Sequence, residues 1–209
     1  MSRAREIADL VGGTTPDIIL KTSDGAILNL QTSDTTVTAD SVLGEINFQA
    51  PDEASGTDAI LIASKIQAVA EGTFSSSSNA TSLVFTTANS AAAGTASGKM
   101  TFTSGGELIL KDTDTADGSS PTITLQSGDT DIAADDVLGT INFQAPDEGA
   151  GTDAILVAAG MSAISEGDFS SSNNATSLVF KTGASAAADE KMRIASDGEV
   201  TITRADNGT

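Results

Sequence analysis

The chain has no His, Cys, Trp or Tyr among its 209 residues. Without His and Cys it cannot build the nucleophiles, proton relays or soft-metal sites that need those side chains. Disulfides are excluded for the same reason. No apolar run is long enough to cross a bilayer, and the charged start has no apolar stretch behind it, so we expect neither membrane insertion nor a secretory signal. We expect assembly in a cytoplasm, and no enzyme activity, cofactor or metal.

Basic residues are also scarce: 29 acidic residues face 10 basic ones, and the net charge is -19. Such a surface repels nucleic-acid phosphates, so we expect no nucleic-acid partner. Ile, Leu, Val and Phe together make up only about a fifth of the chain, close to the level found in disordered chains. A lone globule with so small a core would be marginal. Either the chain is partly disordered, or it shares burial with other copies of itself.

An internal repeat organises the sequence. Residues 30–85 match residues 125–180 at a constant offset of 95, with 38 identities in 56 positions. The run from Leu43 to Glu53 returns from Leu138 to Glu148 with a single change. Because a disordered segment has no need to keep apolar positions in register, the repeat indicates ordered structure.

A shorter element occurs three times: an apolar pair, a tight turn and a second apolar pair. Its turns are Ser23-Asp24-Gly25, Ser104-Gly105-Gly106 and Ser196-Asp197-Gly198. We therefore divide the chain into an N-terminal arm at 1–16, a first module at 17–112 and a second at 113–209. Gly12-Gly13 before Pro16 is a natural hinge.

The hydrophobic period is two, which predicts half-buried strands. Ile46 and Phe48 alternate with polar residues, as do the pairs Leu28 and Leu30, Met100 and Phe102, and Val200 and Ile202. The Asp-Gly and Gly-Gly turns are typical of short hairpins. The stretch 58–71 is open between a helix and one or two strands, with its β-branched residues favouring strands. Only residues 2–11 read as a helix, with Ser2 as its N-cap.

Short strands joined by Ala- and Ser-rich connections leave sheet edges exposed, and exposed edges must be covered. Partner chains can cover them. The sequence therefore predicts an all-β, elongated, repeat-containing fibre of three chains, with a short N-terminal helix or arm. Apolar side chains would face a shared axis, and Asp, Ser and Thr would face outwards.

Several motifs together resemble a known family. They are the series Gly44-x-Ile46-x-Phe48, the run Leu83-Val84-Phe85-Thr86-Thr87, and in the second copy Glu190-Lys191-Met192-Arg193-Ile194 followed by Ser196-Asp197-Gly198. They resemble the shaft repeats of bacteriophage tail fibres. The opening residues 1–10 resemble the N-termini of fibre proteins from marine bacteriophages. The resemblance covers nearly the whole chain.

The resemblance implies a homotrimeric β fibre of a phage virion that serves host attachment. The N-terminus would dock on another virion protein, such as a tail adaptor, nozzle or baseplate component. The docking residues would be Arg3, Arg5, Ile7 and Leu10. Members of the family often continue into a self-cleaving chaperone or a receptor-binding tip. This chain stops at Thr209, which leaves a host surface receptor as a candidate partner only.

Repeated acidic residues are the remaining candidate sites. Asp52, Glu53 and Asp58 return as Asp147, Glu148 and Asp153, and close carboxylates can hold calcium. We read them as solvated turns. The run from Asp112 to Gly118 is not an EF-hand, because Ile123 stands where a bidentate Glu is needed. Carboxylate pairs can also cleave sugars, but seven Phe are the only aromatics, and the repeat favours a core role for them.

Three alternatives to a tail fibre stay open at this point. One is a capsid or tail accessory fibre without receptor binding. Another is a bacterial surface adhesin module, which would need an export route. The third is an enzyme that cleaves polysaccharides. The sequence also leaves open whether the chains interweave or lie side by side.

Overall fold

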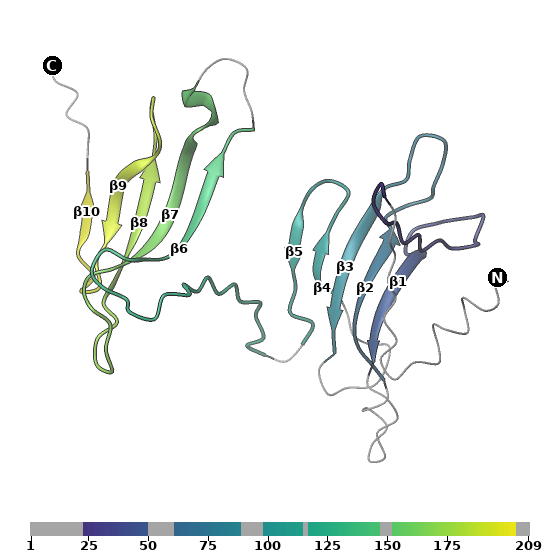
Figure 1. The fold of residues 1–209 in the computed structure, drawn as a ribbon, viewed down its shortest axis with the longest axis horizontal. Coiled ribbons are helices and arrows are strands. Elements are labelled where there is room, and N and C mark those ends of the chain that lie inside the picture. Colours follow the sequence, from purple (N-terminus) through teal and green to yellow (C-terminus); the bar gives the residue numbers. More distant parts are fainter. Residues whose placement is uncertain (1–22, 50–60, 89–97, 115–116, 147–151, 204–209) are drawn as a thin grey trace, which may run out of the picture. The chain divides into compact units, whose positions relative to one another are not determined.

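All strand pairing in the described part of the chain is antiparallel and joins strands that follow one another in sequence. The computed structural model describes residues 23–49, 61–88, 98–114, 117–146 and 152–203. They belong to two units, which divide between Pro121 and Thr122. Each unit holds one five-stranded sheet, and the two are described separately (Figure 1).

The first sheet has the order β1-β2-β3-β4-β5. Its strands are β1 (Val42–Gln49), β2 (Ile62–Ala70), β3 (Thr81–Thr87), β4 (Gly98–Phe102) and β5 (Leu108–Leu110). The register places Ile46 beside Ile66, Ile66 beside Phe85, and Phe85 beside Met100. One row across the sheet is therefore wholly apolar, as the period of two predicts.

The second sheet repeats this plan with the order β10-β9-β8-β7-β6. Its strands are β6 (Val137–Gln144), β7 (Val157–Ser165), β8 (Thr176–Thr182), β9 (Asp189–Ile194) and β10 (Val200–Ile202). A single 3-10 turn, η1 (Asp153–Ile155), precedes β7. The β6–β7 pairing is shifted between Val137 and Gly139 and again between Phe143 and Gln144, as β1–β2 is at the equivalent residues.

Two of the three predicted turns form tight hairpins. In the β4–β5 hairpin, the Gly106 N–H donates to the Thr103 carbonyl at 3.0 Å, and Gly106 has a φ of 81°. In the β9–β10 hairpin, the Gly198 N–H donates to the Ala195 carbonyl at 2.9 Å, with a φ of 89°. This left-handed position closes a three-residue loop at little cost only with glycine.

The described residues confirm the all-β class. The stretch left open between helix and strand contains β2 from Ile62 onward, so the strand alternative is correct for the part described. No strand is found around Leu28 and Leu30, because residues 26–32 join no sheet among the described residues. The apolar residues before the Ser23 turn, which the repeated element would place beside them, lie outside the described residues. The predicted helix at 2–11 lies outside the described residues.

Neither sheet encloses a core of its own. Among the described residues, the only fully buried hydrophobic side chains are Ala70 and Val179. The other buried residues are Gly160 and five with polar side chains: Ser82, Thr86, Ser162, Ser165 and Ser177. Nor do the described residues contain a helix long and apolar enough to cross a membrane. The small number of aliphatic residues thus has a structural counterpart: the described residues of neither sheet form a hydrophobic core that is closed off from solvent.

Candidate association surface

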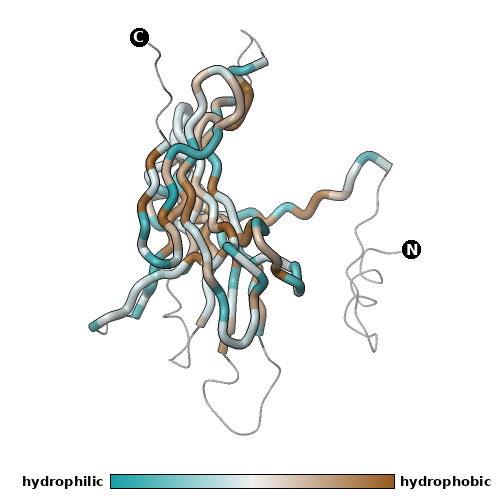
Figure 2. The backbone as a smooth tube through the Cα atoms, turned by 90° about the vertical axis from the view of Figure 1, so that its left-hand side faces the viewer, coloured by the Kyte–Doolittle hydropathy of each residue, from teal (hydrophilic) through white to brown (hydrophobic). Residues whose placement is uncertain are grey.

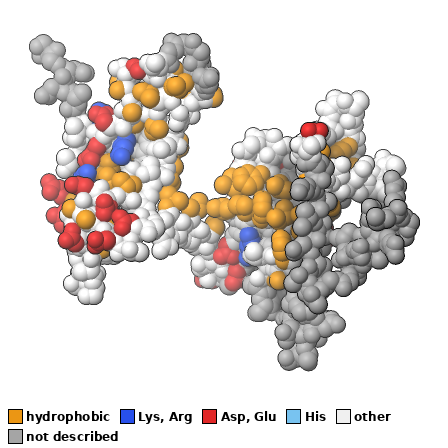
Figure 3. All heavy atoms as spheres, in the orientation of Figure 1, with side chains coloured by type: hydrophobic (Ala, Val, Ile, Leu, Met, Phe, Trp, Pro, Cys, Tyr) orange, Lys and Arg blue, Asp and Glu red, His pale blue; other side chains and the backbone are white. Residues whose placement is uncertain are grey.

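One face of the first sheet has two neighbouring rows that contain no polar side chain from edge to edge, beside a row in which Phe48 lies next to Ser64. Its largest exposed members come from four strands, and Phe48 and Leu108 each keep 51% of their surface accessible. The members named by the register are Ile46, Phe48, Ile66, Ala68, Leu83, Phe85, Met100, Phe102, Leu108 and Leu110. Figure 3 shows hydrophobic side chains gathered over β3, β4 and β5. Phe85 and Phe102 meet edge to face on it, with ring centroids 6.2 Å apart.

The second sheet has the same face, built from equivalent positions. Ile141 lies beside Met161, Met161 beside Phe180, and Phe180 beside Met192. Phe143 is 59% exposed and Ile202 is 72% exposed. Hydrophobic and hydrophilic residues alternate along the strands (Figure 2). Isolated apolar residues are common on surfaces, but a continuous face of this kind marks an interaction site.

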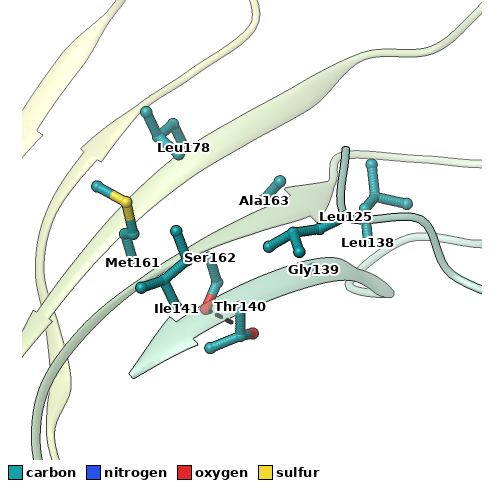
Figure 4. A pocket seen from close by; sticks show the side chains of 9 residues that line it. All are labelled: Leu125, Leu138, Gly139, Thr140, Ile141, Met161, Ser162, Ala163 and Leu178. Carbon is teal, nitrogen blue, oxygen red and sulfur yellow. Dashed lines mark hydrogen bonds between the residues drawn. The ribbon is translucent and has the colours of Figure 1, made fainter. Parts of the chain in front are cut away.

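A shallow hollow of about 240 Å³ interrupts the apolar face of the second unit. Its walls come from β6, β7, β8 and the segment before β6, and include Leu125, Ile141, Met161, Ala163 and Leu178 (Figure 4). Thr140 and Ser162 are the polar residues lining it, but they alternate along β6 and β7 with Ile141 and Met161, so their hydroxyl groups, 3.1 Å apart, belong to the other face of the sheet. The side chains on the hollow's own face are apolar, and the hollow therefore suits an apolar side chain.

Gly139 lies on the floor of this hollow. A residue with a side chain would not fit there, because a leucine lies directly over it. A Cβ atom built on Gly139 would stand 2.7 Å from the Leu125 Cβ. In the first unit, a Cβ on Gly44 would stand 2.7 Å from the Leu30 Cβ. Real Cβ atoms do not approach so closely. The repeat therefore keeps a leucine and a glycine together, 14 positions apart, in both modules.

Each unit also has a carboxylate that ties three strands together. Glu71, directly after β2, accepts from the Ser82 hydroxyl at 2.5 Å and from the Ser104 N–H at 2.8 Å, both at Oε1. The Ser104 hydroxyl donates to Oε2. Ser82 lies in β3 and Ser104 in the turn between β4 and β5. One side chain thus holds the hairpin against the rest of the sheet.

Glu166 repeats the arrangement in the second unit. It accepts from the Ser177 hydroxyl at 2.5 Å, the Ser196 N–H at 2.8 Å and the Ser196 hydroxyl at 2.5 Å. We call Glu71 and Glu166, with their serine donors, the carboxylate clamps. The Ser104 hydroxyl is the main cause that lowers the pKa of Glu71, and the Ser177 hydroxyl that of Glu166. Donors to a carboxylate favour its charged form.

We expect the clamps to make stability depend on acid pH. A carboxyl whose pKa is lowered by folding stabilises the fold fully above its unfolded pKa of about 4.3, and this contribution is lost as the pH falls through the folded pKa. The melting temperature of the wild-type chain should therefore fall between about pH 5 and pH 3, as measured by circular dichroism. In the double variant Glu71→Gln and Glu166→Gln the fall should be smaller.

The matched control for this prediction is Glu107→Gln. Glu107 follows the same β4–β5 turn and uses its backbone in it. This variant should keep the acid dependence of the wild-type chain. Equal pH profiles for the wild type and the clamp variant would show that the clamps contribute no linked stability.

The opposite face of each sheet carries charged and other polar side chains, and some of them form ion pairs. Lys65 and Glu45 form an ion pair of 3.8 Å between β2 and β1. In the second unit the two equivalent positions are Gly160 and Thr140, so both partners change together. There, Arg193 donates to both carboxylate oxygens of Glu190, at 2.9 and 2.7 Å. Several residues of this face, among them Thr86, Ser162 and Val179, are already buried within the chain, whereas the apolar face is the more exposed one and is left for association.

The structure reaches few of the sites named from the sequence alone. The docking residues Arg3, Arg5, Ile7 and Leu10 lie outside the described residues, as do Asp52, Glu53, Asp58, Asp147 and Glu148. Asp112 lies within the described residues, and its carboxylate accepts a hydrogen bond from the Asp114 N–H at 3.0 Å. This contact is that of a local turn. No group of three acidic residues close enough to hold a metal ion occurs in the described ranges.

The carboxylate clamps were missed in the sequence because their donors lie 11, 30 and 33 positions away from the glutamates. A signal was nevertheless present. Glu71 and Ser82 recur at an offset of 95 as Glu166 and Ser177, and each predicted turn begins with serine. Polar residues kept in register in both modules were the pointer to this network.

Comparisons with known proteins give a fold likeness only. No protein-family model matches the chain, and no curated protein matches its sequence. Among solved structures, the chain is similar to the carboxy-terminal domain of the bacteriophage T5 L-shaped tail fibre with its intra-molecular chaperone domain. The identity is 12% and the TM-score 0.43, over 92% of this chain and 63% of that one.

A second structure, of the carboxy-terminal domain of the same T5 fibre, matches with a TM-score of 0.37 at 12% identity. That match covers 91% of each chain. This chain spans about 63% of the length of the first structure. At this distance neither likeness carries an argument about function, which must come from the residues themselves.

Proposed function

We propose that the chain is a structural tail-fibre protein of a phage virion, in which three copies assemble through their apolar sheet faces. The observation that carries the proposal is the continuous, exposed apolar face repeated in both units. A fibre shaft needs repeated modules, each with one face for its partners and one for solvent. The shaft motifs found in the sequence lie on these sheets: Leu83–Phe85 in β3, and Met192 and Ile194 in β9.

The role of such a fibre is mechanical. Its modules would set reach and stiffness, its N-terminus would attach it to the virion, and several fibres on one particle would raise the effective concentration of binding sites at a host surface. A capsid or tail accessory fibre shares this architecture and differs in its place of attachment. The fibre is expected in the virion, and outside the cell once particles are released.

Immunogold labelling of purified particles tests the place of attachment. An antibody raised against the purified chain should label the tail or its appendages in electron micrographs. Label over the capsid would replace the tail fibre with an accessory fibre. Intact particles without label, alongside labelled purified chain as the positive control, would contradict a virion role.

The charge of the assembly leads to a further expected result. Three chains at -19 each carry -57. The screening length is about 30 Å at 0.01 M salt and about 3 Å at 1 M, so salt weakens the repulsion between the chains. The melting temperature of the trimer should rise from low salt to seawater-like ionic strength in a calorimetric series. A melting temperature independent of sodium chloride would rule out this electrostatic account.

A further inference from the structure

Two segments look like strands but pair with no strand among the described residues. Residues 26–31 and 122–126 are extended, and they occupy equivalent positions of the repeat. Apolar residues stand at alternate positions, Leu28 and Leu30 in the first and Ile123 and Leu125 in the second, and the first also has Ile27 on its other side. Leu28 is 62% exposed and Ile123 is 67% exposed. Within the described part of the chain, neither segment makes a main-chain hydrogen bond. We call these two segments the donor segments.

A donor segment cannot reach the far edge of its own sheet. Leu125 lies over Gly139 in β6, and the sheet order puts β6 at one edge and β10 at the other. Four strand spacings of about 4.8 Å separate these edges, or roughly 19 Å. The same geometry holds in the first unit, where Leu30 lies over Gly44 in β1 and β5 is the far edge.

The two edges of each sheet differ in their capacity to accept a strand. β6 is shifted against β7 at two points, and such irregularities blunt an edge. β10 pairs with β9 without interruption. The Glu199 carbonyl accepts from the Ala195 N–H at the end of β9, and the Thr203 N–H donates to the Lys191 carbonyl in β9. The alternation of an antiparallel ladder therefore turns the N–H and C=O groups of Val200 and Ile202 outward.

β5 is the equivalent acceptor edge in the first unit. Glu107 and Lys111 bond back to β4, which turns the main-chain groups of Leu108 and Leu110 outward. The side chains of these outward residues belong to the apolar face. A donor segment with apolar residues at every second position matches that face, because opposite residues of two antiparallel strands share one face.

We propose that the donor segments add a strand to the sheets of a neighbouring copy of the chain: residues 122–126 to its β10, and residues 26–31 to its β5. This proposal rests on the proposed trimer and specifies that its chains exchange strands. Each chain carries one donor and one acceptor edge in each unit. A closed ring of identical copies therefore uses all of them and leaves none over. Leu125 stays over its own Gly139, so the segment links two neighbouring sheets.

Amide hydrogen exchange on the assembled protein tests the exchange of strands. The Ile123 and Leu125 amides should lie opposite Val200 and Ile202 of the neighbouring copy and donate main-chain hydrogen bonds to it. They should therefore exchange on the order of 100-fold more slowly than in an unstructured chain. The Thr122 and Thr124 amides should point away and exchange fast. Light scattering on the same sample gives the mass. Three chains with no slow amide in 122–126 would overturn strand exchange and leave the trimer standing. The mass of one chain would overturn the trimer itself.

Proline variants separate pairing from burial of the segment. Ile123→Pro removes an N–H that points to the neighbour, whereas Thr124→Pro removes one that points away, and both prolines suit extended backbone. Ile123→Pro should abolish the protection of the Leu125 amide, and Thr124→Pro should keep it. Ile123→Ala, which loses the side chain but keeps the N–H, should also keep it. If both proline variants lost the protection of the Leu125 amide equally, the proposed pairing would be contradicted.

Discussion

Replacing Phe48 and Phe143 together by serine is expected to reduce the mass of the assembly from three chains to one. One chain has a mass of 20.9 kDa, and three times that value is about 63 kDa. The two rings are equivalent in the repeat and remain 51% and 59% exposed in the isolated chain. Covering the rest of each ring contributes roughly 1 kcal/mol. Six rings in a trimer then account for about 6 kcal/mol, or some four decades in the association constant.

The matched control is the double variant Asn47→Ser and Asn142→Ser. These residues lie next to the two phenylalanines, in β1 and β6, but on the polar face. The control should keep the mass of three chains at the same protein concentration. Circular dichroism must show that both variants keep their strands. A trimeric phenylalanine variant would mean that the apolar faces do not hold the chains together.

Gly139→Ala is expected to lower the melting temperature by at least about 5 °C. The new Cβ would stand 2.7 Å from the Leu125 Cβ. The main chain of Leu125 must therefore move away from β6. Overpacking of this kind costs typically about 1–3 kcal/mol, and each kcal/mol shifts the melting of a domain of this size by about 4–8 °C. Gly44→Ala should act in the same way against Leu30.

Gly128→Ala provides the control, because a Cβ at Gly128 has nothing within 4 Å. Differential scanning calorimetry should show no loss of stability in this variant. If Gly139→Ala has the same melting temperature as Gly128→Ala, Leu125 is not held over Gly139 in solution. The placement of the donor segments beside β1 and β6 would then be wrong as well.

The strands and hairpins were predictable because their signals are local. Alternation around Phe48, Met100 and Val200, and the turns at Gly106 and Gly198, marked them directly. The constant offset of the repeat also foretold that the two sheets share one plan. A period of two needs only a few neighbouring residues to be seen.

The errors and omissions arose from longer-range relations. The segment around Leu28 has the alternation of a strand, but pairing depends on a neighbour that local pattern cannot supply. The clamp of Glu71 joins residues up to 33 positions apart. The close approach of Leu30 to Gly44 depends on how the chain enters β1. Each needs the register of the sheet, which only the fold defines.

The small core is the feature that joins sequence and proposed function. A chain poor in aliphatic residues gathers many of them on one face of each sheet and leaves that face open. The acidic and hydroxyl side chains are left for solvent and for ties such as the clamp at Glu166. Such a chain encloses its apolar surface only by association, which is the central claim of this account.

The measurement that tests this claim most directly is the absolute mass of the purified chain in solution, by light scattering at moderate salt. The account predicts three chains, about 63 kDa against 20.9 kDa for one. A folded single chain would contradict it, because each sheet would then be stable with its apolar face in water. The fibre-shaft role would fall with it, and a capsid decoration or a surface adhesin module would take its place.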